Sequence, residues 1–587
     1  MANEISPDLN TRPPAWYHGL TRYQWWVLII ATMGWMFDTM DQQFFNLGRG
    51  PAMNEVLGLE PVAPGLKQLG KHQRLSYTAG ELEELVSAGV LTAQEKTKVL
   101  SDRQGQRRDR VTRMDVARVV GEALVAAKHI ELGQARLAEA GVTATTLDEA
   151  ALDDLVAKNV VSAEAAEAQR ARFPSGQIPR QELALHLGKE IAKVQADKAG
   201  DNATFIFVMG WAVGGLFFGW VGDALGRAKT MALTILCYAL FTGLNGLAQT
   251  QMQFNVLRFL TALGVGGEFA AGAALVAETM PDRSRPAALG ALQALSALGN
   301  MTAAALAFFI MPVWGWRWLF AIGALPGLVA VFVFLGLKEP EKWKQARAKW
   351  LEDKTTGVAT ARASYVGLFQ DPRWRKRAIV GLLLGVVGVG GLWGVGFFTP
   401  ELNRSIAKAY SEEAREKLVS KAFFLQQFGA VLGIWAYTFV ALRIGRRPAF
   451  ALFFVLAFFV VSYTFLFADT IWEAYALAMP VGFVTLGLFG GYAIYFPELF
   501  PTRLRATGVG FCYNVGRFLA ALVPSLKSGL KGMFMSGAVV LPFLPSAVQN
   551  AERAIRYGSF IMIFVYILGL IVLLFAPETK DQPLPED

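Results

Sequence analysis

The sequence contains very little cysteine and no recognisable metal-binding or catalytic cluster. Cys237 and Cys512 are the only cysteines among 587 residues, and each lies in a long apolar stretch. Two isolated thiols provide no disulfide framework and no spacing typical of metal ligands. The sequence also has no nucleophile–base set and no phosphate-binding loop. We therefore expect a protein without enzymatic activity, metal or cofactor.

Charged residues are scarce as well, at 18% of the chain, and their placement is uneven. A net charge of +9 would suit nucleic-acid binding, but the Lys and Arg residues gather in alternate loops between apolar blocks. Alternate loops of a polytopic chain lie on one side of the membrane, and the side rich in Lys and Arg is cytoplasmic. We therefore expect no nucleic-acid partner and both termini in the cytoplasm. The first apolar run lacks a small-residue cleavage site, which favours a retained helix over a signal peptide.

Hydrophobic residues are abundant, at 53% of the chain. They form blocks of about 20 residues, the length that crosses a bilayer as a helix. The sequence therefore predicts an all-α, multi-pass protein of the plasma membrane, which is the inner membrane of a bacterium. The twelve predicted transmembrane spans are 24–46, 203–223, 228–249, 252–278, 286–312, 316–338, 376–402, 421–443, 448–468, 470–496, 503–527 and 555–577.

An internal repeat divides these spans into two six-helix pseudo-repeats. Residues 278–285, E-T-M-P-D-R-S-R, match residues 498–505, E-L-F-P-T-R-L-R, at a constant offset of 220. The G-R pair at 226–227 matches the pair at 445–446 at an offset of 219. Each motif lies at the predicted cytoplasmic end of the second or fourth helix of its half. Duplicated halves with a binding site between them are a common plan of secondary transporters.

Several motifs in these halves resemble those of the major facilitator superfamily. G-W-V-G-D-A-L-G-R-A-K at 219–229 is similar to the family's loop signature G-x-x-x-D-R-x-G-R-R, although Ala224 and Ala228 replace basic residues. R-F-L-T-A-L-G-V-G-G at 258–267 resembles the family's fourth-helix motif. The resemblance implies a secondary transporter of the sugar-porter or aromatic-acid and metabolite proton symporter branches. The segments that point to these branches are 315–320, 495–508 and 577–580.

Residues 51–200 form a polar segment that is unusual for the first loop of such a transporter. By topology this insertion, between helices 1 and 2, is extracytoplasmic. It contains its own repeat, which predicts two tandem helical modules at about 81–126 and 151–193, loosely similar to the helical N-terminal regions of type II secretion ATPases. A disordered loop is the alternative that its composition leaves open. The aligned segments are 81–93 with 151–163 and 111–121 with 178–188.

The residues that end and begin helices in these modules are also repeated. Gly89 and Asn159 tolerate the left-handed conformation that ends a helix. Thr92 and Ser162 are suited to cap the helix that follows, and Thr92 with Glu95 predicts a capping box. The complete predicted organisation is a cytoplasmic N-terminus with helix 1 at 1–50, the insertion at 51–200, helices 2–6 at 201–338, a cytoplasmic loop at 339–375, helices 7–12 at 376–577 and a cytoplasmic tail at 578–587.

Two acids in the first predicted span are candidates for proton coupling. Asp38 and Asp41 are three residues apart, so they share one helix face and can face one cavity. Two neighbouring carboxylates in a low dielectric do not both ionise readily, so one retains a proton near neutral pH. The spacing resembles the acid pair of aromatic-acid/proton symporters, although Thr39 and Met40 replace that family's glycine and aromatic residue. Solvation at the helix end, or an ion pair with arginine, is the structural alternative.

Other polar residues in the spans are candidates for the same site, because charge inside a bilayer is costly. Glu268 resembles the acid of metabolite/proton symporters and is a third candidate for proton coupling; a structural partner for an arginine is the alternative. Arg517 is expected to face the cavity, as in the symporters that it resembles, and guanidinium binds carboxylate in bidentate fashion. Arg258 lies about 15 Å from Glu268 along a helix, so the two are not expected to pair. The further predicted substrate-binding residues are Asn514, Gln293, Asn300, Gln426, Trp393 and Tyr495.

Charged loop residues are predicted to form gates that stabilise the outward-open state. Their alternative role is to set topology alone. The predicted gating residues are Asp223, Gly226, Arg227, Arg258, Glu278, Arg283, Glu498 and Arg503.

Taken together, these features predict a monomeric transporter in the lipid bilayer that carries a small organic acid or sugar-like metabolite with protons by alternating access. Two alternatives remain. One is a proton-coupled drug or metabolite antiporter. The other is a transporter-derived sensor or receptor that binds an extracytoplasmic protein partner through the insertion.

Overall fold

The structure is a computed structural model that describes residues 15–59, 68–69, 76–101, 111–327, 332–333, 336–355, 365–520 and 550–586. Its residues form two compact units. The larger unit comprises Met1–Leu47, Thr204–Leu247 and Asn255–Asp587, and the smaller comprises Gly48–Ala203 and Ala248–Phe254. Three of the described helices, α1, α8 and α10, contribute residues to both units.

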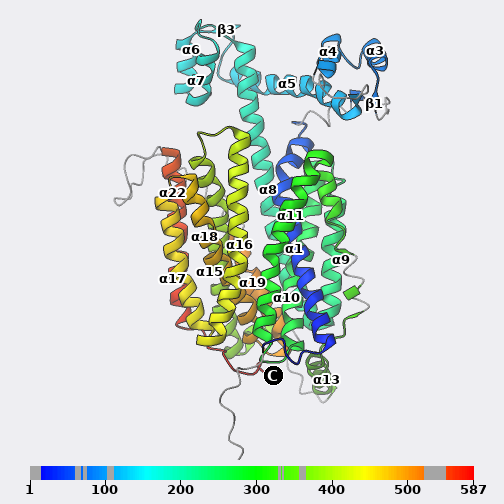
Figure 1. The fold of residues 1–587 in the computed structure, drawn as a ribbon, viewed down its shortest axis with the longest axis vertical. Coiled ribbons are helices and arrows are strands. Elements are labelled where there is room, and N and C mark those ends of the chain that lie inside the picture. Colours follow the sequence, from blue (N-terminus) through cyan, green and yellow to red (C-terminus); the bar gives the residue numbers. More distant parts are fainter. Residues whose placement is uncertain are drawn as a thin grey trace, which may run out of the picture. The chain divides into compact units, whose positions relative to one another are not determined.

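The larger unit is a bundle of long helices arranged as two groups. α1 and α9–α11 lie together on one side, and α15–α18 and α22 lie together on the other (Figure 1). The first group and its neighbour α8 are α1 (Arg22–Val56), α8 (Arg180–Leu225), α9 (Arg227–Asn245), α10 (Gln251–Thr279) and α11 (Arg285–Ile322). The connecting helices are α13 (Glu341–Thr355) and α14 (Tyr365–Gln370). The second group continues with α15 (Pro372–Ile406), α16 (Glu412–Ile444), α17 (Arg446–Phe467), α18 (Ile471–Leu499), the 3₁₀ helix η1 (Thr502–Leu504), α19 (Arg505–Asn514), α20 (Gly516–Ala520), α22 (Asn550–Ile563) and α23 (Val565–Leu573).

Seven helices within the described residues are long and apolar enough to cross a membrane. The total of twelve therefore stays a prediction. α1 contains the predicted span 24–46, and Gly315, with a φ of 77°, interrupts α11 between the predicted spans 286–312 and 316–338. Parts of the spans 316–338 and 503–527 lie outside the described residues. The seven helices are Arg180–Leu225, Gln251–Thr279, Arg285–Met311, Lys417–Ile444, Arg446–Phe467, Ile471–Leu499 and Arg556–Leu573.

Helix packing repeats between the two groups at equivalent glycines. In the first group, a Cβ placed on Gly214 of α8 would lie 2.1 Å from the Leu263 carbonyl oxygen of α10. In the second, a Cβ on Gly433 of α16 would lie 2.1 Å from the Phe483 carbonyl oxygen of α18. The glycines are 219 residues apart and the carbonyls 220, which are the offsets of the loop motifs. Small residues let helix backbones approach closely in a membrane protein, so both halves use the same contact.

The smaller unit contains two modules with the same order of elements. The first contains β1 (Ser76–Tyr77), α3 (Ala79–Ser87), α4 (Ala93–Ser101), β2 (Val111–Thr112) and α5 (Arg113–Glu139). The second contains β3 (Thr146–Leu147), α6 (Glu149–Ala157), α7 (Ala163–Arg172), β4 (Ile178–Pro179) and the start of α8. Each strand pair is antiparallel, with Ser76 opposite Thr112 and Thr146 opposite Pro179.

The predicted helix ends in these modules are confirmed. Gly89 and Asn159 have φ values of 68° and 54°, in the left-handed region. The Thr92 backbone N–H donates to Glu95 at 2.7 Å, and the Glu95 N–H donates to the Thr92 hydroxyl at 3.2 Å, which completes the capping box. Ser162 accepts from the Ala165 N–H at 3.1 Å. Local sequence therefore determines where these short helices begin and end.

Each module has its own hydrophobic core, built from equivalent positions. Leu82 and Leu85 of α3 are buried in the first core, as are Leu152 and Leu155 of α6 in the second. The long helices of the two modules also touch, because a Cβ on Gly188 of α8 would lie 1.7 Å from the His129 carbonyl oxygen of α5. The two cores explain why a segment of mixed polar composition forms ordered helices.

Candidate functional site

Asp41 of α1 lies in a buried ion pair with Arg258 of α10. The Arg258 Nη2 donates to Asp41 Oδ2 at 3.1 Å, and the Thr242 hydroxyl of α9 donates to Asp41 Oδ1 at 2.6 Å. The Arg258 guanidinium lies 4.6 Å from the ring centres of Phe45 and Phe207. This is the arginine-paired arrangement that the sequence left open for the acids. It also gives Arg258, a predicted gating residue, a partner on α1.

Asp38, one turn before Asp41, has no such partner in the described part of the chain. Its side chain is fully buried, and Gln42 Nε2 donates to its Oδ2 at 3.3 Å. Its other oxygen, Oδ1, accepts no hydrogen bond from the described residues. In a dry interior a carboxylate without a cationic partner is unstable in its charged form. The two acids of the first helix therefore differ in their surroundings, although they are only three residues apart.

Glu268 of α10 is a second buried acid without an ion pair in the part of the chain that the structure describes. Neither of its carboxylate oxygens accepts a hydrogen bond from these residues, and its exposed fraction is 1%. It packs directly against Gly34 of α1, where an added Cβ would lie 2.1 Å from Oε1. Since Gly34 is one helical turn from Asp38, Asp38 and Glu268 are neighbours on facing helices, and they are within electrostatic range of each other.

Arg517 of α20 is the buried cation of the same region. Its Nη1 donates to the Tyr513 carbonyl at 2.5 Å and to Asn514 Oδ1 at 2.8 Å. Its guanidinium lies 3.9 Å from the ring centre of Trp211. Arg517 is within electrostatic range of Asp38. In the described part of the chain, however, no carboxylate oxygen lies within 4.0 Å of its guanidinium nitrogens. Arg517 is therefore a buried charge that is stabilised by rings and carbonyls.

Aromatic side chains from both halves surround these charges. Trp35 of α1 lies 4.8 Å from Phe269 of α10, and Phe269 stacks on Tyr513 of α19 at 4.1 Å. Phe489 of α18 meets Tyr513 edge-on at 6.1 Å. Among the buried polar atoms without a partner are the indole nitrogens of Trp35 and Trp211. Unpartnered donors and acceptors beside aromatic walls are suited to a polar ligand.

The other predicted substrate-binding residues lie in different places. Asn514 donates to the Gly266 carbonyl at 3.4 Å, and Asn300 of α11 donates to Gln427 of α16 at 3.1 Å, so both join the halves. Gln293 and Gln426 are buried, and Gln293 Oε1 has no partner. Tyr495, in contrast, donates its hydroxyl to the Pro577 carbonyl at 2.6 Å near the C-terminus. The side chain of Trp393 lies outside the described residues.

At the loop motifs, a charge network joins the two halves. The Arg227 Nη2 donates to Glu278 Oε1 at 2.9 Å, within the first half. Arg505, at the start of α19 in the second half, donates to the same oxygen at 2.7 Å. All three side chains are buried. Glu278 thus holds two arginines, one from each half; we call Arg227, Glu278, Arg505 and Asp223 the inter-half latch.

Asp223 strengthens the latch by capping α19. Its Oδ1 accepts the Ala506 N–H at 3.1 Å and its Oδ2 accepts the Thr507 N–H at 2.7 Å. A carboxylate at a helix N-terminus satisfies free amides and interacts favourably with the helix dipole. Asp223 also pairs with Arg227 at 2.9 Å. An acid of the first half therefore fixes the start of a helix of the second half.

The second copy of the motif makes its contacts within its own half. Arg446 donates to Glu498 at 2.9 Å, and Glu498 accepts from the Thr579 hydroxyl at 2.5 Å. Leu442 occupies the position equivalent to Asp223, so no matching cap of α11 can form. The latch between the halves is therefore one-sided.

The first arginine of each loop pair is the more exposed one. Arg283 is exposed and Arg503 is half-buried, whereas Arg285 and Arg505 are buried. Arg285 donates to the Ala277 carbonyl at 2.9 Å. The structure thus assigns the inter-half ion pair to Arg505, two residues after the predicted Arg503.

Gly226 lies between α8 and α9 and makes room for a further carboxylate. Its φ is 120°, a backbone conformation that residues with a side chain rarely adopt. A Cβ added to Gly226 would also lie 2.3 Å from Glu339 Oε1. Glu339 accepts the Arg227 backbone N–H at 2.7 Å. In the second half, Glu578 has this role beside Gly445 and accepts the Arg446 N–H at 2.9 Å. Burial acts to raise the pKa of Glu578, but backbone N–H groups, that of Arg446 first, bring it below its ordinary value.

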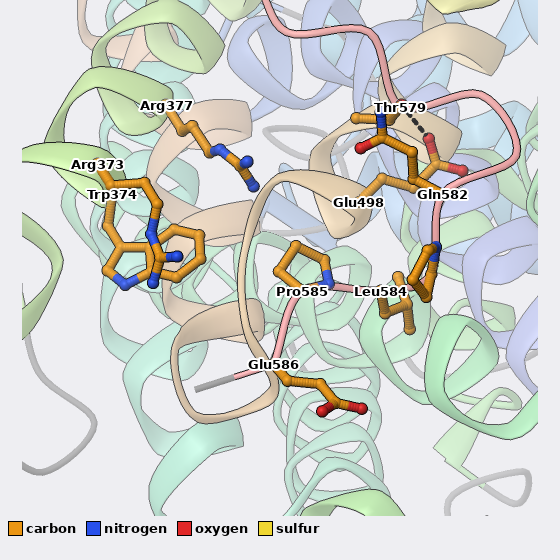
Figure 2. Close-up of a pocket in the computed structure, with 10 residues that line it drawn as sticks. Arg373, Trp374, Arg377, Glu498, Thr579, Gln582, Leu584, Pro585 and Glu586 are labelled. Carbon is orange, nitrogen blue, oxygen red and sulfur yellow. Dashed lines mark hydrogen bonds between the residues drawn. The ribbon is translucent and has the colours of Figure 1, made fainter.

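A cavity of about 580 Å³ lies beside the second copy of the motif (Figure 2). Its walls are the start of α15, with Arg373, Trp374 and Arg377, and the C-terminal residues 582–586. The guanidinium of Arg373 lies 4.0 Å from the Trp374 ring centre. We call Asp38, Asp41, Arg258, Glu268 and Arg517 the central charged residues. None of them lines this cavity, so we do not assign the cavity to the substrate.

Comparison with known proteins identifies the family. Residues 183–524 match the Major Facilitator Superfamily. The cis,cis-muconate transport protein of Acinetobacter baylyi is 32% identical over 376 residues, which cover 64% of this chain and 84% of that protein. The probable 4-methylmuconolactone transporter of Cupriavidus pinatubonensis is 34% identical over 378 residues, 63% of this chain and 79% of that protein.

Solved structures agree on the fold. The proton:xylose symporter XylE bound to 6-bromo-6-deoxy-D-glucose has a TM-score of 0.52 at 15% identity, over 67% of this chain and 89% of that chain. A double tryptophan mutant of XylE has a TM-score of 0.53 at 16% identity, over 79% of this chain and 97% of that chain. Since the family match spans more than half of the sequence, this protein belongs to the Major Facilitator Superfamily.

Proposed function

We propose that this transporter is a proton-coupled symporter for a small organic carboxylate. The observation that carries the proposal is the grouping of two buried acids, Asp38 and Glu268, near a buried arginine, Arg517, none of which has an ion pair within the described residues. Ionisable groups inside a membrane protein mark substrate and proton pathways.

The chemistry of these groups supports different roles for the two acids and for the arginine. Asp38 and Glu268 are acids that can bind a proton on one side of the membrane and release it on the other. Arg517 offers its Nε and Nη2 to a substrate carboxylate, because within the described residues only Nη1 is engaged in hydrogen bonds. Two parallel N–H groups of a guanidinium match the two oxygens of a carboxylate. The names of the two bacterial relatives, for muconate and a muconolactone, are consistent with an unsaturated organic acid.

The latch supports alternating access between the two halves. We propose that it lies on the cytoplasmic side and that it closes this side while the carrier faces outward. Opening this side would break the bonds from Asp223 to α19 and from Glu278 to Arg505, while the bonds in the second copy would stay intact. Rocking of one half against the other then exposes the central charges to each side in turn.

Transport into proteoliposomes tests the proposed function. Purified protein is reconstituted, and labelled cis,cis-muconate is supplied outside with an inward proton gradient. The expected result is accumulation above the outside concentration, which a proton ionophore abolishes. Uptake that only equilibrates would identify a uniporter, and uptake driven by an outward proton gradient would identify an antiporter.

The insertion supports a second, additional role as an extracytoplasmic docking module for a protein partner. Its two modules have separate hydrophobic cores, and their helices begin and end at local caps. Because each module has its own core, we propose that transport does not depend on the insertion.

Removing the insertion is expected to leave transport intact. In a variant with residues 55–198 replaced by a short flexible loop, muconate uptake should stay within about twofold of the wild type, because none of the central charged residues lies in that range. Uptake and size-exclusion behaviour are measured together. Loss of uptake in a well-folded variant would instead make the insertion part of the transport machinery.

A further inference from the structure

The contact between Trp211 and Arg517 joins the two halves of the transporter. Trp211 is on α8 in the first half, and Arg517 is on α20 in the second. The guanidinium carbon lies 3.9 Å from the indole centre, and the exposed fractions of Trp211 and Arg517 are 4% and 2%. A cation on an aromatic face is attracted by the ring electrons, most strongly when both are desolvated.

The position of Trp211 is fixed by its neighbours. A Cβ on Gly266 of α10 would lie 2.1 Å from the Trp211 carbonyl oxygen, so the two backbones are in contact. Phe207 packs edge-on against the indole at 5.8 Å. The Trp211 ring is therefore held in place by the first half, and the Arg517 guanidinium of the second half packs against it.

The face and the edge of the Arg517 guanidinium are used differently. Its face lies on Trp211, and Nη1 is engaged by Tyr513 and Asn514. Nε has no partner, and no hydrogen bond of Nη2 occurs within the described residues. A substrate carboxylate can therefore bind the Nε–Nη2 edge while the indole keeps the face.

These contacts explain how the protein can bury the charge of Arg517. A buried charge without a counter-group is costly, and within the described residues no carboxylate oxygen lies within 4.0 Å of the Arg517 guanidinium nitrogens. We propose that Trp211 is a positioning residue that holds the Arg517 charge while the carrier is empty, and thereby permits the return step of the transport cycle. This inference deepens the proposed function and rests on its assignment of Arg517 to the substrate.

Measurements of net uptake and of exchange distinguish this role of Trp211 from a general structural role. Net uptake needs the empty carrier to return, whereas exchange of inside for outside substrate uses the loaded carrier in both directions. The Trp211 ring, at 3.9 Å, is the nearer of two aromatic rings on the guanidinium, and the Tyr513 ring lies at 4.4 Å. Loss of the nearer ring should therefore slow net uptake and spare exchange. This ratio can be measured for downhill transport, so it does not depend on whether the carrier is coupled to protons.

The experiment compares Trp211→Leu and Trp211→Phe with Trp220→Leu, an exposed tryptophan on the same helix. Downhill net uptake and exchange of labelled cis,cis-muconate are measured in proteoliposomes. Trp211→Leu is expected to slow net uptake about tenfold or more while exchange stays within about twofold, because a desolvated cation–π contact is worth about one power of ten or more. Trp211→Phe keeps a ring face and should lie between this variant and the wild type, and Trp220→Leu should behave as the wild type.

An equal loss of both modes in Trp211→Leu, or no loss, would overturn the role of Trp211. If Trp211→Leu does not fold, the ratio in Trp211→Phe decides: a lower ratio of net uptake to exchange supports the role, and an unchanged ratio rejects it. Failure of the proposed function has a different signature. The wild type would then exchange or equilibrate muconate without a response to the proton gradient, and the ratio of net uptake to exchange in the Trp211 variants would still decide the role of Trp211.

Discussion

Asp38→Asn is expected to abolish uphill accumulation of substrate while leaving exchange intact. Asparagine keeps the size of the side chain and the contact with Gln42, but it cannot bind and release a proton. With an inward gradient of one pH unit, one coupled proton supports about tenfold accumulation, since one unit corresponds to about 1.4 kcal/mol. Labelled cis,cis-muconate in proteoliposomes should accumulate in the wild type and only equilibrate in the variant.

Asp41→Asn is the matched control three residues away. It removes the carboxylate that pairs with the fully buried Arg258, and breaking such a pair costs about 3–5 kcal/mol. The expected effect is therefore a lower melting temperature, which Asp38→Asn should not cause. Accumulation that persists in Asp38→Asn would show that Asp38 is not the coupling acid and would transfer that role to Glu268.

Glu278→Gln is expected to open the side of the transporter that carries the latch. Glu278 is the shared partner of Arg227 and Arg505, so its neutral form leaves an inter-half arginine without its carboxylate. The closed state should lose about 3–5 kcal/mol, which shifts its equilibrium with the open state by about two to four powers of ten. Spin labels at Lys229 and Lys376, which are exposed residues of the two halves, should move apart.

Glu498→Gln provides the internal control for this experiment. It is the equivalent position of the repeat, and its partners Arg446 and Thr579 belong to its own half. The label distance should therefore stay close to the wild-type value. Equal opening in both variants, or opening in Glu498→Gln alone, would contradict a one-sided latch.

Local features of this protein could be predicted from sequence because they depend on neighbouring residues. The caps at Thr92 and Ser162, and the left-handed Gly89 and Asn159, follow from residue type and spacing. The offset of about 220 residues similarly predicts equivalent contacts in the two halves, and the glycine contacts of α8 and α16 have this relationship.

The distinct surroundings of Asp38 and Asp41 could not be predicted, because they depend on which helices face each residue. One turn of α1 separates an acid paired with Arg258 from an acid that forms no ion pair with the described residues. Trp211 gave no signal at all, since one tryptophan in an apolar span resembles any packing residue. Arg505 did have a signal in the repeated E-x-x-P-x-R-x-R pattern, but only the fold distinguishes it from Arg503.

The most direct test of proton-coupled symport measures protons and not substrate. Proteoliposomes with a pH-sensitive dye inside receive cis,cis-muconate outside, with no initial proton gradient and with potassium and valinomycin to clamp the membrane potential. We predict that the internal pH falls when muconate is added to wild-type protein and stays constant with Asp38→Asn. Muconate entry into wild-type liposomes at constant internal pH would contradict proton coupling.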